Sequence, residues 1–400
     1  MSEDREDRED RENKQELIII GGGVMGLYTA YAASHFTNKV TILEKLTIGN
    51  QKAASFSYTR SIRNDYLDPL YARLAYEARG LWQELERHST EPFIINCGCL
   101  NIAKSSVTPD LTETYAEQSY RVLTDLHLNA EAFSGEELQQ RFPQFAVDLG
   151  RLDVEAGMLY VPAITRTLLT TLQERRVRIV EEVEVASIEQ LPDNLLAVHT
   201  SAGQFITSKL VITAGLGTND VLKRIPGCTL QFPLSPDRPS QCKYYIPPAN
   251  KRAIFTPDAL PVFAYLDVGI YGHPLYEGRT PGVKIGFYHP PDVHDVNTGH
   301  VAIPDVASFV TECMPSLQDA TAIDVTDVDQ CFYDLVADDN FILGHLPDNA
   351  SISVGVGWRG TGYKYAPWVG RTLMQLALQG GTVYDIRRFS PQRFVQQEEQ

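Results

Sequence analysis

Three glycines near the start of the chain have the spacing of a phosphate-binding turn. Gly21, Gly23 and Gly26 form a Gly-x-Gly-x-x-Gly pattern between the apolar residues 17–20 and a run rich in small residues. The first glycine of such a turn permits the sharp bend, the second lets the backbone approach a pyrophosphate, and the third lets helix and strand pack closely. The pattern, which also contains Val24 and Met25, therefore predicts that this turn binds a dinucleotide.

An acidic residue stands where such a unit needs one. Residues 39–43 form a second run rich in β-branched residues, and Glu44 follows it directly. A carboxylate at this point can accept hydrogen bonds from the ribose hydroxyls of an adenosine. Strand, turn, helix, strand and acid in this order predict a βαβ unit that binds a nucleotide; the alternative is a glycine-rich turn that binds none.

The rest of the chain favours FAD over NAD, because a long stretch separates this unit from the next clear strand. The apolar residues 209–213 run into Ala214 and Gly215. This segment resembles the late strand of the glutathione-reductase-type FAD fold, whose small residues lie beside the FAD. Residues 178–188 resemble the segment of that fold that lays a valine, here Val183, against the adenine.

The six cysteines are too few for a disulfide framework and favour a reduced, cytoplasmic setting. Cys97 and Cys99 have no second pair at zinc spacing, so we expect no metal site. Five are interpreted as small buried hydrophobic residues: Cys97, Cys99, Cys228, Cys242 and Cys313. The sixth, Cys331, lies two residues before Tyr333.

Residues 327–370, together with the βαβ unit, resemble the monomeric sarcosine oxidase group of the D-amino-acid-oxidase (DAO) superfamily. This group also contains N-methyltryptophan, pipecolate and fructosyl-amino-acid oxidases, and the resemblance runs from residue 17 to residue 394. It implies that Cys331 carries FAD as a covalent thioether on the flavin 8-methyl group. Cysteine suits this role because a thiolate is a strong, soft nucleophile.

The same resemblance implies a glycine-rich loop over the flavin ring in residues 357–364. Backbone N–H groups there can reach the flavin carbonyl where negative charge collects on reduction. The loop residues assigned to the cofactor are Gly357, Trp358, Gly360, Thr361, Gly362 and Lys364. Lys364 also helps to bind the substrate carboxylate, and we assign Tyr333 and Arg359 to the substrate. The group has serine and histidine where this chain has Arg359 and Thr361, which alters the pocket.

A Thr-Arg-x-x-Arg pattern supplies further residues of the implied site. Thr59 and Arg60 correspond to residues that lie against the flavin, and we assign Arg60 a catalytic role as well. Arg63 joins Lys364 in binding the carboxylate, for which the planar guanidinium fork is suited. Phe56 stands where the group has a histidine.

Two later segments complete the implied catalytic set. Tyr271 corresponds to a tyrosine that reaches the substrate, and Lys284 to the lysine that activates oxygen. His289 corresponds to an active-site histidine, although Tyr288 competes for that place. The alternative is a strand lysine that points to water, but the apolar residues on both sides of Lys284 predict a buried strand and favour the functional role.

Composition limits the remaining possibilities. Of the 400 residues, 43% are hydrophobic and 22% charged, with a formal net charge of −16. These values exclude collagen and disordered polyelectrolytes, and the acid excess argues against a nucleic-acid partner. No apolar run is long enough to cross a bilayer. We therefore expect a small-molecule amine or amino acid and O2 as partners, with no nucleic acid and no membrane, in a monomer or weak dimer.

The periodicity predicts an α/β protein: a Rossmann FAD-binding domain and a substrate domain with a mixed sheet. We expect an acidic disordered tail at residues 1–16, the FAD domain in 17–95, 150–225 and 325–395, and the substrate domain in 96–149 and 226–324. Helices are expected at residues 26–35 and 70–85. Strands are expected at 17–20, 39–43, 177–180, 195–200, 210–213, 262–268, 282–288 and 352–356.

The expected function is FAD-dependent oxidation of a secondary or cyclic amine that bears a carboxylate, such as an N-methyl amino acid, a pipecolate-like or proline-like compound or a biosynthetic amino acid. The product is an imine, and O2 is reduced to H2O2. Two alternatives stay open. One is a flavin dehydrogenase that uses another electron acceptor, and the other is a flavoprotein scaffold without turnover.

Overall fold

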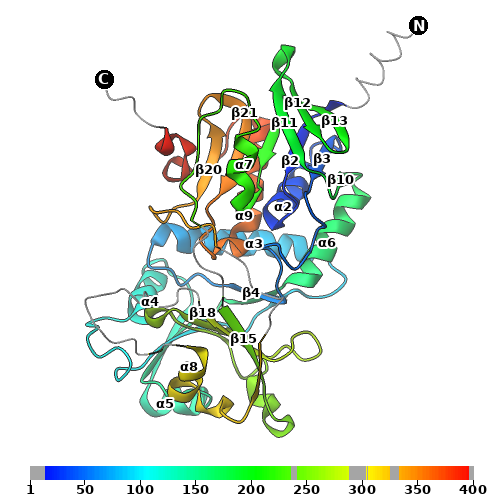
Figure 1. Ribbon diagram of the computed structural model, residues 1–400. Coiled ribbons are helices and arrows are strands. Elements are labelled where there is room, and N and C mark those ends of the chain that lie inside the picture. Colours follow the sequence, from blue (N-terminus) through cyan, green and yellow to red (C-terminus); the bar gives the residue numbers. More distant parts are fainter. Residues whose placement is uncertain (1–13, 236–240, 288–302, 304, 325–332, 396–400) are drawn as a thin grey trace. The chain divides into compact units, whose positions relative to one another are not determined.

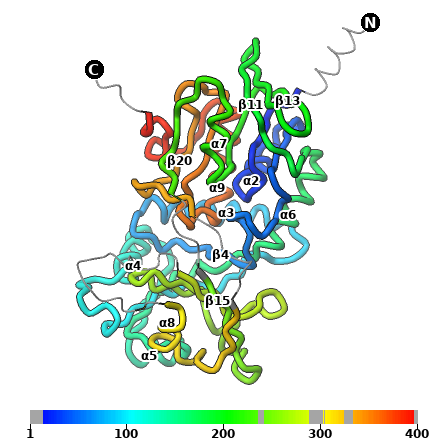
Figure 2. Tube along the Cα trace, viewed as in Figure 1, coloured from blue at the N-terminus to red at the C-terminus, as the bar shows by residue number. Residues whose placement is uncertain are grey.

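The computed structural model describes residues 14–235, 241–287, 303, 305–324 and 333–395. Contacts divide the chain into two compact units. The first unit comprises residues 1–55, 165–238 and 332–400, and the second comprises 56–164 and 239–331. Figure 2 follows the chain by colour and shows that blue, green and red segments, far apart in the sequence, come together in the first unit.

A six-stranded sheet forms the centre of the first unit. Its order is β10 (Arg178–Val180), β3 (Val40–Leu43), β2 (Leu17–Ile20), β14 (Leu210–Ile212), β21 (Asn349–Val356) and β20 (Ile342–Leu346). All neighbours are parallel except β20, which pairs antiparallel with β21. Strands β2, β3 and β14 are buried along their whole length, as expected for a parallel sheet covered on both faces.

Helices α2 (Val24–Ala33) and α9 (Ala366–Met374) lie side by side in this unit (Figure 1). Their close approach depends on Gly370, because a Cβ there would lie 2.7 Å from the Thr29 backbone nitrogen. The unit also contains α7 (Thr218–Leu222) and most of α6 (Val161–Glu174). The packing of α2 on α9 joins the N-terminal nucleotide turn to the C-terminal segment.

A second, four-stranded sheet extends the first unit. Its order is β1 (Lys14–Gln15), β13 (Gly203–Thr207), β12 (Leu196–Thr200) and β11 (Val185–Gln190). Strand β1 pairs in parallel with β13, placing Lys14 opposite Ile206. The disordered tail was expected to extend to residue 16. That expectation is wrong for residues 14 and 15, because their backbone groups find partners in β13.

An eight-stranded mixed sheet dominates the second unit. Its order is β19 (Thr321–Asp324), β15 (Gln241–Ile246), β18 (Val283–Phe287), β17 (Ile270–His273), β16 (Val262–Tyr265), β6 (Cys99–Ala103), β8 (Leu149–Asp153) and β7 (Ala130–Ser134). Only the pair β16 and β6 is parallel among these strands. Helices α4 (Tyr115–Asp125), α5 (Gly135–Arg141) and α8 (Val306–Cys313) accompany this sheet. Buried aromatic side chains such as Phe263 and Phe309 fill the core beside it.

A small antiparallel sheet of the second unit holds the Thr-Arg-x-x-Arg segment. It consists of β4 (Thr59–Ile62), β9 (Gly157–Tyr160) and β5 (Ile94–Ile95). Helix α3 (Pro69–Glu86) follows β4, with Asp68 capping its first turn. Residues 56–95 and 150–164, assigned to the FAD domain from the sequence, therefore cluster by contacts with the second unit.

The expected fold class is confirmed: an α/β unit with a Rossmann-type parallel sheet accompanies a unit built on a mixed sheet. The strand expected at 262–268 is shorter, because residues 266–268 turn into a short 3-10 helix that ends at Gly269, where φ is +73°. None of the described helices combines the length and apolar character required to span a bilayer.

Candidate functional site

The glycine turn lies where β2 meets α2, against the end of β14. At Gly21, φ is +108°, and a Cβ would lie 2.5 Å from the carbonyl oxygen of Thr213. A Cβ on Gly26 would lie 1.9 Å from the carbonyl oxygen of Gly21. Both positions therefore require glycine, one for the bend and the other for helix packing.

The start of α2 has the properties of an anion site. Gly23 is the N-cap residue and has no side chain with which to cap the helix. The hydroxyl of Ser55 accepts a hydrogen bond from the Val24 N–H at 2.9 Å. Open backbone donors and the positive end of the helix dipole suit the phosphates of a dinucleotide. The turn therefore fits the diphosphate of FAD.

Glu44 connects the second strand to this turn. Its carboxylate accepts hydrogen bonds from the Gly22 N–H at 2.6 Å and from the Leu46 N–H at 2.8 Å. Its carbonyl oxygen accepts a hydrogen bond from the N–H of Val183, which is buried. The two residues predicted to contact the adenosine therefore lie next to each other. Ala214 and Gly215 follow β14 after one intervening residue, and a Cβ on Gly21 would lie 3.1 Å from the Ala214 backbone nitrogen.

A buried carboxylate holds the glycine-rich loop. Asp334 accepts a hydrogen bond from the Gly357 N–H at 2.9 Å, and its backbone carbonyl accepts one from the Arg359 N–H. Burial raises the pKa of Asp334 to about 6, although nearby backbone N–H groups lower it. Tyr333 is buried against Gly360, where a Cβ would lie 2.6 Å from its ring. A Cβ on Gly362 would lie 3.1 Å from the Met25 methyl carbon, so this loop lies beside α2.

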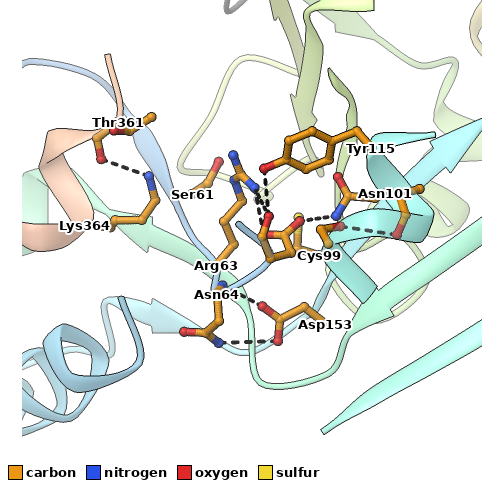
Figure 3. Close-up of polar contacts among 12 residues, drawn as sticks. Ser61, Arg63, Asn64, Cys99, Asn101, Tyr115, Asp153, Thr361 and Lys364 are labelled. Atoms are coloured by element: carbon orange, nitrogen blue, oxygen red, sulfur yellow. Dashed lines mark hydrogen bonds and ion pairs between the residues drawn. The ribbon is translucent and has the colours of Figure 1, made fainter. Parts of the chain in front are cut away.

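The polar side chains of the loop are directed to local partners. Lys364 is buried and donates to the Thr361 carbonyl oxygen at 2.9 Å, as Figure 3 shows. The Thr361 hydroxyl donates to the carbonyl of Trp358 at 3.2 Å. Arg359, assigned to the substrate from the sequence, forms an ion pair of 2.9 Å with Asp339. Its role toward a substrate stays a prediction.

In the second unit, Lys284 lies in the interior of the mixed sheet with 1% of its surface exposed. Its Nζ lies 3.3 Å from the Ser57 hydroxyl oxygen and 5.7 Å from the centre of the Tyr271 ring. Tyr271 comes from β17 and Lys284 from β18, which pair antiparallel. The structure therefore brings two of the predicted catalytic side chains together and adds Ser57.

His273 bridges the mixed sheet and β4. Its Nδ1 lies 2.7 Å from the Thr59 hydroxyl and its Nε2 2.9 Å from the Ser61 hydroxyl. This buried histidine was not selected from the sequence, because a histidine within an apolar strand resembles an ordinary core residue. Arg60, on the same strand β4, donates to the Phe56 carbonyl oxygen at 2.8 Å.

Arg63 belongs to a buried polar cluster of the second unit (Figure 3). Its Nη1 donates to a carboxylate oxygen of Asp65 at 2.8 Å and to the Asp65 carbonyl oxygen at 2.9 Å. The other carboxylate oxygen of Asp65 accepts from Asn101 and from the thiol of Cys99. The Tyr115 hydroxyl donates to the Asp65 carbonyl oxygen at 2.9 Å. The cluster thus surrounds Asp65 with donors.

The titration of this cluster reflects burial and charge. Burial opposes the charge of Arg63, but the Asp65 carboxylate and the neighbouring Tyr115, Tyr66 and Cys99 together outweigh it, so the pKa of Arg63 is well above its ordinary value. Burial, and then the charge of Asp65, raise the pKa of Asp153 to about 7. Asp153 accepts hydrogen bonds from the backbone and side chain of Asn64. Burial also raises the pKa of the Cys99 thiol, which argues against a reactive thiolate there.

Some predicted residues lie outside the described part of the chain. They are Cys331, Tyr288 and His289. Lys364 belongs to the first unit and Arg63 to the second, so their joint binding of one carboxylate stays a prediction. Of the five other cysteines, Cys99 and Cys313 are buried as expected, whereas Cys97, Cys228 and Cys242 are partly exposed, so the expectation of a buried residue is wrong for these three. Within the described ranges, no group of three or more His, Cys, Asp or Glu side chains is placed to hold a metal ion.

Asp65, Asp153 and Asp334 were missed by sequence reasoning. Acidic residues in loops are usually solvated, and no spacing distinguishes a buried one. For two of them the one available signal was position, since Asp65 lies two residues after the end of the Thr-Arg-x-x-Arg pattern and Asp334 lies three residues after Cys331.

Comparison with known proteins is consistent with this arrangement. The model of the DAO family, described as FAD dependent oxidoreductase, matches residues 16–376. Peroxisomal sarcosine oxidase from Homo sapiens is 28% identical over 393 residues, covering 95% of this chain and 96% of that protein. N-methyl-L-tryptophan oxidase from Salmonella enteritidis is 26% identical over 407 residues, covering 96% of this chain and 100% of that protein.

Solved structures share the fold. L-proline dehydrogenase from P. horikoshii has a TM-score of 0.76 at 18% sequence identity, covering 96% of this chain and 98% of that one. At this level of identity the likeness concerns the fold alone.

Proposed function

Because this chain belongs to the DAO family of FAD-dependent oxidoreductases, we propose that it oxidises the C–N bond of a secondary or cyclic amine that bears a carboxylate. The names of the curated relatives support this substrate class, since they are oxidases of N-methylated amino acids. The observation that carries the proposal is the burial of two cationic side chains, Arg63 and Lys284, in the second unit.

The reaction removes two electrons and two protons from the amine and leaves an imine. FAD, when bound, accepts the electrons and passes them to O2, which takes up two protons and becomes H2O2. Gly21, Gly23 and Glu44 would hold its diphosphate and adenosine, and residues 357–362 its ring.

The chain's own residues bind the substrate and influence its protonation. Arg63 binds the carboxylate, and we assign Lys364 to the same task. Nearby cations favour the neutral form of the amine, which is the form that can be oxidised, so no separate general base is required. Lys284 stabilises the negative charge that develops on oxygen as it is reduced. Tyr271 completes the substrate contacts, with Arg359 and Tyr333.

We further propose that Cys331 binds FAD covalently. The buried packing of Tyr333 against Gly360 supports this assignment, because it anchors the chain two residues beyond Cys331 beside the glycine-rich loop. Denaturation tests it directly: the yellow flavin should precipitate with the wild-type protein and stay in solution after Cys331→Ser. Release of the flavin from wild-type protein would exclude the covalent bond.

The proposed activity is tested by anaerobic addition of a panel containing sarcosine, N-methyl-L-tryptophan, L-proline and L-pipecolate. We expect at least one to bleach the flavin absorbance, and admission of air to restore it with one H2O2 per imine. Failure of every compound to bleach the flavin would favour a scaffold that does not turn over.

A flavin amine dehydrogenase is the second candidate. Bleaching by an amine, followed by reoxidation with a quinone dye but not with O2, would support it. The buried Lys284 favours the oxidase, because a cation at the site of oxygen reduction serves no purpose in electron transfer to a large acceptor.

The remaining assignments belong to the same proposal. We place the protein in the cytoplasm, although the human relative is named as peroxisomal, and propose a monomer or weak dimer. Ultracentrifugation and localisation of a tagged chain test these two assignments. We also retain the division into an FAD domain and a substrate domain.

A further inference from the structure

The Arg63 guanidinium is held along one side only. Both of its hydrogen bonds leave from Nη1, and both end on Asp65, one on the carboxylate and one on the carbonyl oxygen. The Tyr66 ring covers a face of the guanidinium, with 4.6 Å between the Arg63 Cζ and the ring centre. Among the described residues, neither Nε nor Nη2 of Arg63 donates a hydrogen bond to any acceptor.

This asymmetry matters because a carboxylate binds arginine best through two parallel hydrogen bonds along one edge of the fork. The Nε and Nη2 edge is such an edge. A flexible arginine would lose rotamer freedom when it bound a ligand, whereas one already fixed through Nη1 loses little. Asp65 can therefore orient Arg63 without occupying the atoms that a carboxylate needs.

Asp65 is itself held by its neighbours. Asn101 and Cys99 donate to the carboxylate oxygen that faces away from Arg63, and Tyr115 donates to the Asp65 carbonyl oxygen. The side chain of Asp65 is 1% exposed and that of Arg63 10% exposed. A buried ion pair supported in this way has a fixed geometry, since neither partner can exchange its contacts for water.

We propose that Asp65 is the positioning residue for carboxylate recognition in this protein: it anchors Nη1 of Arg63 and presents the Nε and Nη2 edge to the carboxylate of the ligand. This inference rests on the proposed function for the identity of the ligand, but the geometry of the anchor is independent of it. The opposite role would be competition, in which Asp65 must release Arg63 before a carboxylate binds.

Two substitutions separate these roles. Asp65→Ala removes the carboxylate and leaves Nη1 only the backbone carbonyl, so Arg63 gains freedom. Asp65→Asn retains an oxygen for Nη1. Its new N–H groups face Asn101, whose side-chain oxygen is buried and has no hydrogen-bond partner in the described structure. A turn of the Asn101 amide then restores a donor-to-acceptor contact.

The experiment measures binding to the holoenzyme by titration calorimetry. The probes are methoxyacetate and tetrahydrofuran-2-carboxylate, which replace the amine nitrogen by oxygen and cannot be oxidised to an imine, and the two corresponding uncharged amides. We expect Asp65→Ala to weaken carboxylate binding about tenfold or more and Asp65→Asn to stay within about threefold of wild type, because anchoring through a charge-assisted bond is lost only in the first. Binding of the amides should change little in either variant.

Asp148→Asn is the matched control, since it removes an exposed carboxylate from the same unit. Unchanged carboxylate binding by Asp65→Ala would overturn the proposal. Tighter binding would overturn it too, and would show instead that Asp65 competes with the ligand carboxylate for Arg63. If Asp65→Ala loses as much affinity for the amides as for the carboxylates, Asp65 has only a structural role. The proposal is also refuted if the wild-type protein binds no carboxylate.

The outcome is distinguishable from failure of the proposed function. If amines bleach the flavin but Asp65→Ala binds carboxylates normally, only the positioning role fails. If no amine bleaches it while carboxylate affinity falls as expected, only the amine oxidase assignment fails.

Discussion

Lys284 Nζ lies 3.3 Å from the hydroxyl oxygen of Ser57 in the interior of the second unit. The Ser57 hydroxyl in turn donates to the Thr59 carbonyl oxygen at 2.9 Å. Ser57, two residues before β4 begins, thus contacts the amine of a residue on β18. A lysine buried in this way is held for a purpose other than solubility, because its desolvation is costly.

Replacement of Lys284 by methionine should separate the two halves of the proposed reaction. The variant keeps an unbranched side chain that is one atom shorter and loses the charge. We expect reoxidation of the reduced holoenzyme by O2 to slow about 100-fold or more, because a preorganised cation is lost. Anaerobic reduction by the amine should change only a few-fold. Stopped-flow absorbance measures both rates.

Lys243→Met is the control for this experiment. Lys243 lies on the neighbouring strand β15 opposite Ile285, so strand alternation directs its side chain to the other face from Lys284. Equal slowing of reoxidation in both variants would contradict a specific role of Lys284.

Gly26→Ala should prevent FAD binding and destabilise the first unit. The added Cβ would lie 1.9 Å from the Gly21 carbonyl oxygen, so α2 must move away from the turn. We expect a loss of about 1–3 kcal/mol in unfolding free energy and purification without flavin. Gly80→Ala in α3 is the opposite case, because nothing lies within 4 Å of its added Cβ. It should stabilise the protein by about 0.5–1 kcal/mol. Thermal unfolding and flavin absorbance are measured for both variants. A Gly26→Ala protein that is purified yellow would refute the requirement for glycine at position 26.

Asp334→Ala should loosen the glycine-rich loop. It leaves the Gly357 N–H without its acceptor in a buried position, which costs about 1–3 kcal/mol. Asp334→Asn keeps an oxygen in the same place, so its free energy of unfolding should fall much less. Urea unfolding gives the free energies, and proteolysis within residues 357–362 reports on the loop. Similar losses of unfolding free energy in both variants would show that the charge of Asp334, and not its hydrogen bond to Gly357, stabilises the loop.

Compared with the wild-type protein, the Asp153→Asn variant should become more stable as the pH rises. The pKa of Asp153 is raised in the folded protein, so between about pH 4 and pH 7 the folded state binds more protons than the unfolded state. Wild-type stability therefore falls with rising pH across this window, by up to about 1.4 kcal/mol per pH unit. The amide in Asp153→Asn carries no such penalty, and its N–H can reach the side-chain oxygen of Asn64, which is buried without a partner in the described structure.

Melting temperatures at pH 5, 6, 7 and 8 test this prediction. In Asp148 the pKa is lowered by hydrogen bonds from Ser105, so wild type gains stability above the ordinary carboxyl pKa and Asp148→Asn should lose it there. From pH 5 to pH 8 the difference between Asp148→Asn and wild type should therefore stay constant, whereas Asp153→Asn should gain stability relative to wild type as the pH rises to about 7. A pH-independent difference between Asp153→Asn and wild type would show that Asp153 is not protonated in the folded state.

The local features of the first unit could be predicted from the sequence. Strand β2 has the expected bounds, and α2 and β3 begin within two residues of theirs. The position of Glu44 beside the turn also followed from spacing alone. These features depend on contacts between near neighbours in the chain, for which periodicity and glycine spacing are direct signals.

The polar partners could not be predicted in the same way. The pairs formed by Lys284 with Ser57, and by His273 with Thr59, join residues more than 200 positions apart. Nothing in the local sequence distinguishes such a serine or histidine from others of its type.

The sequence by itself determined the α/β class, the nucleotide turn and the residue types of the candidate site, because each depends on short-range pattern and side-chain chemistry. Only the tertiary structure decided which carboxylates are buried, which of them holds Arg63 and which hydroxyl meets Lys284. Burial and the pairing of charges are properties of contacts between distant segments, and the pKa of a group follows from those contacts rather than from its neighbours in the chain.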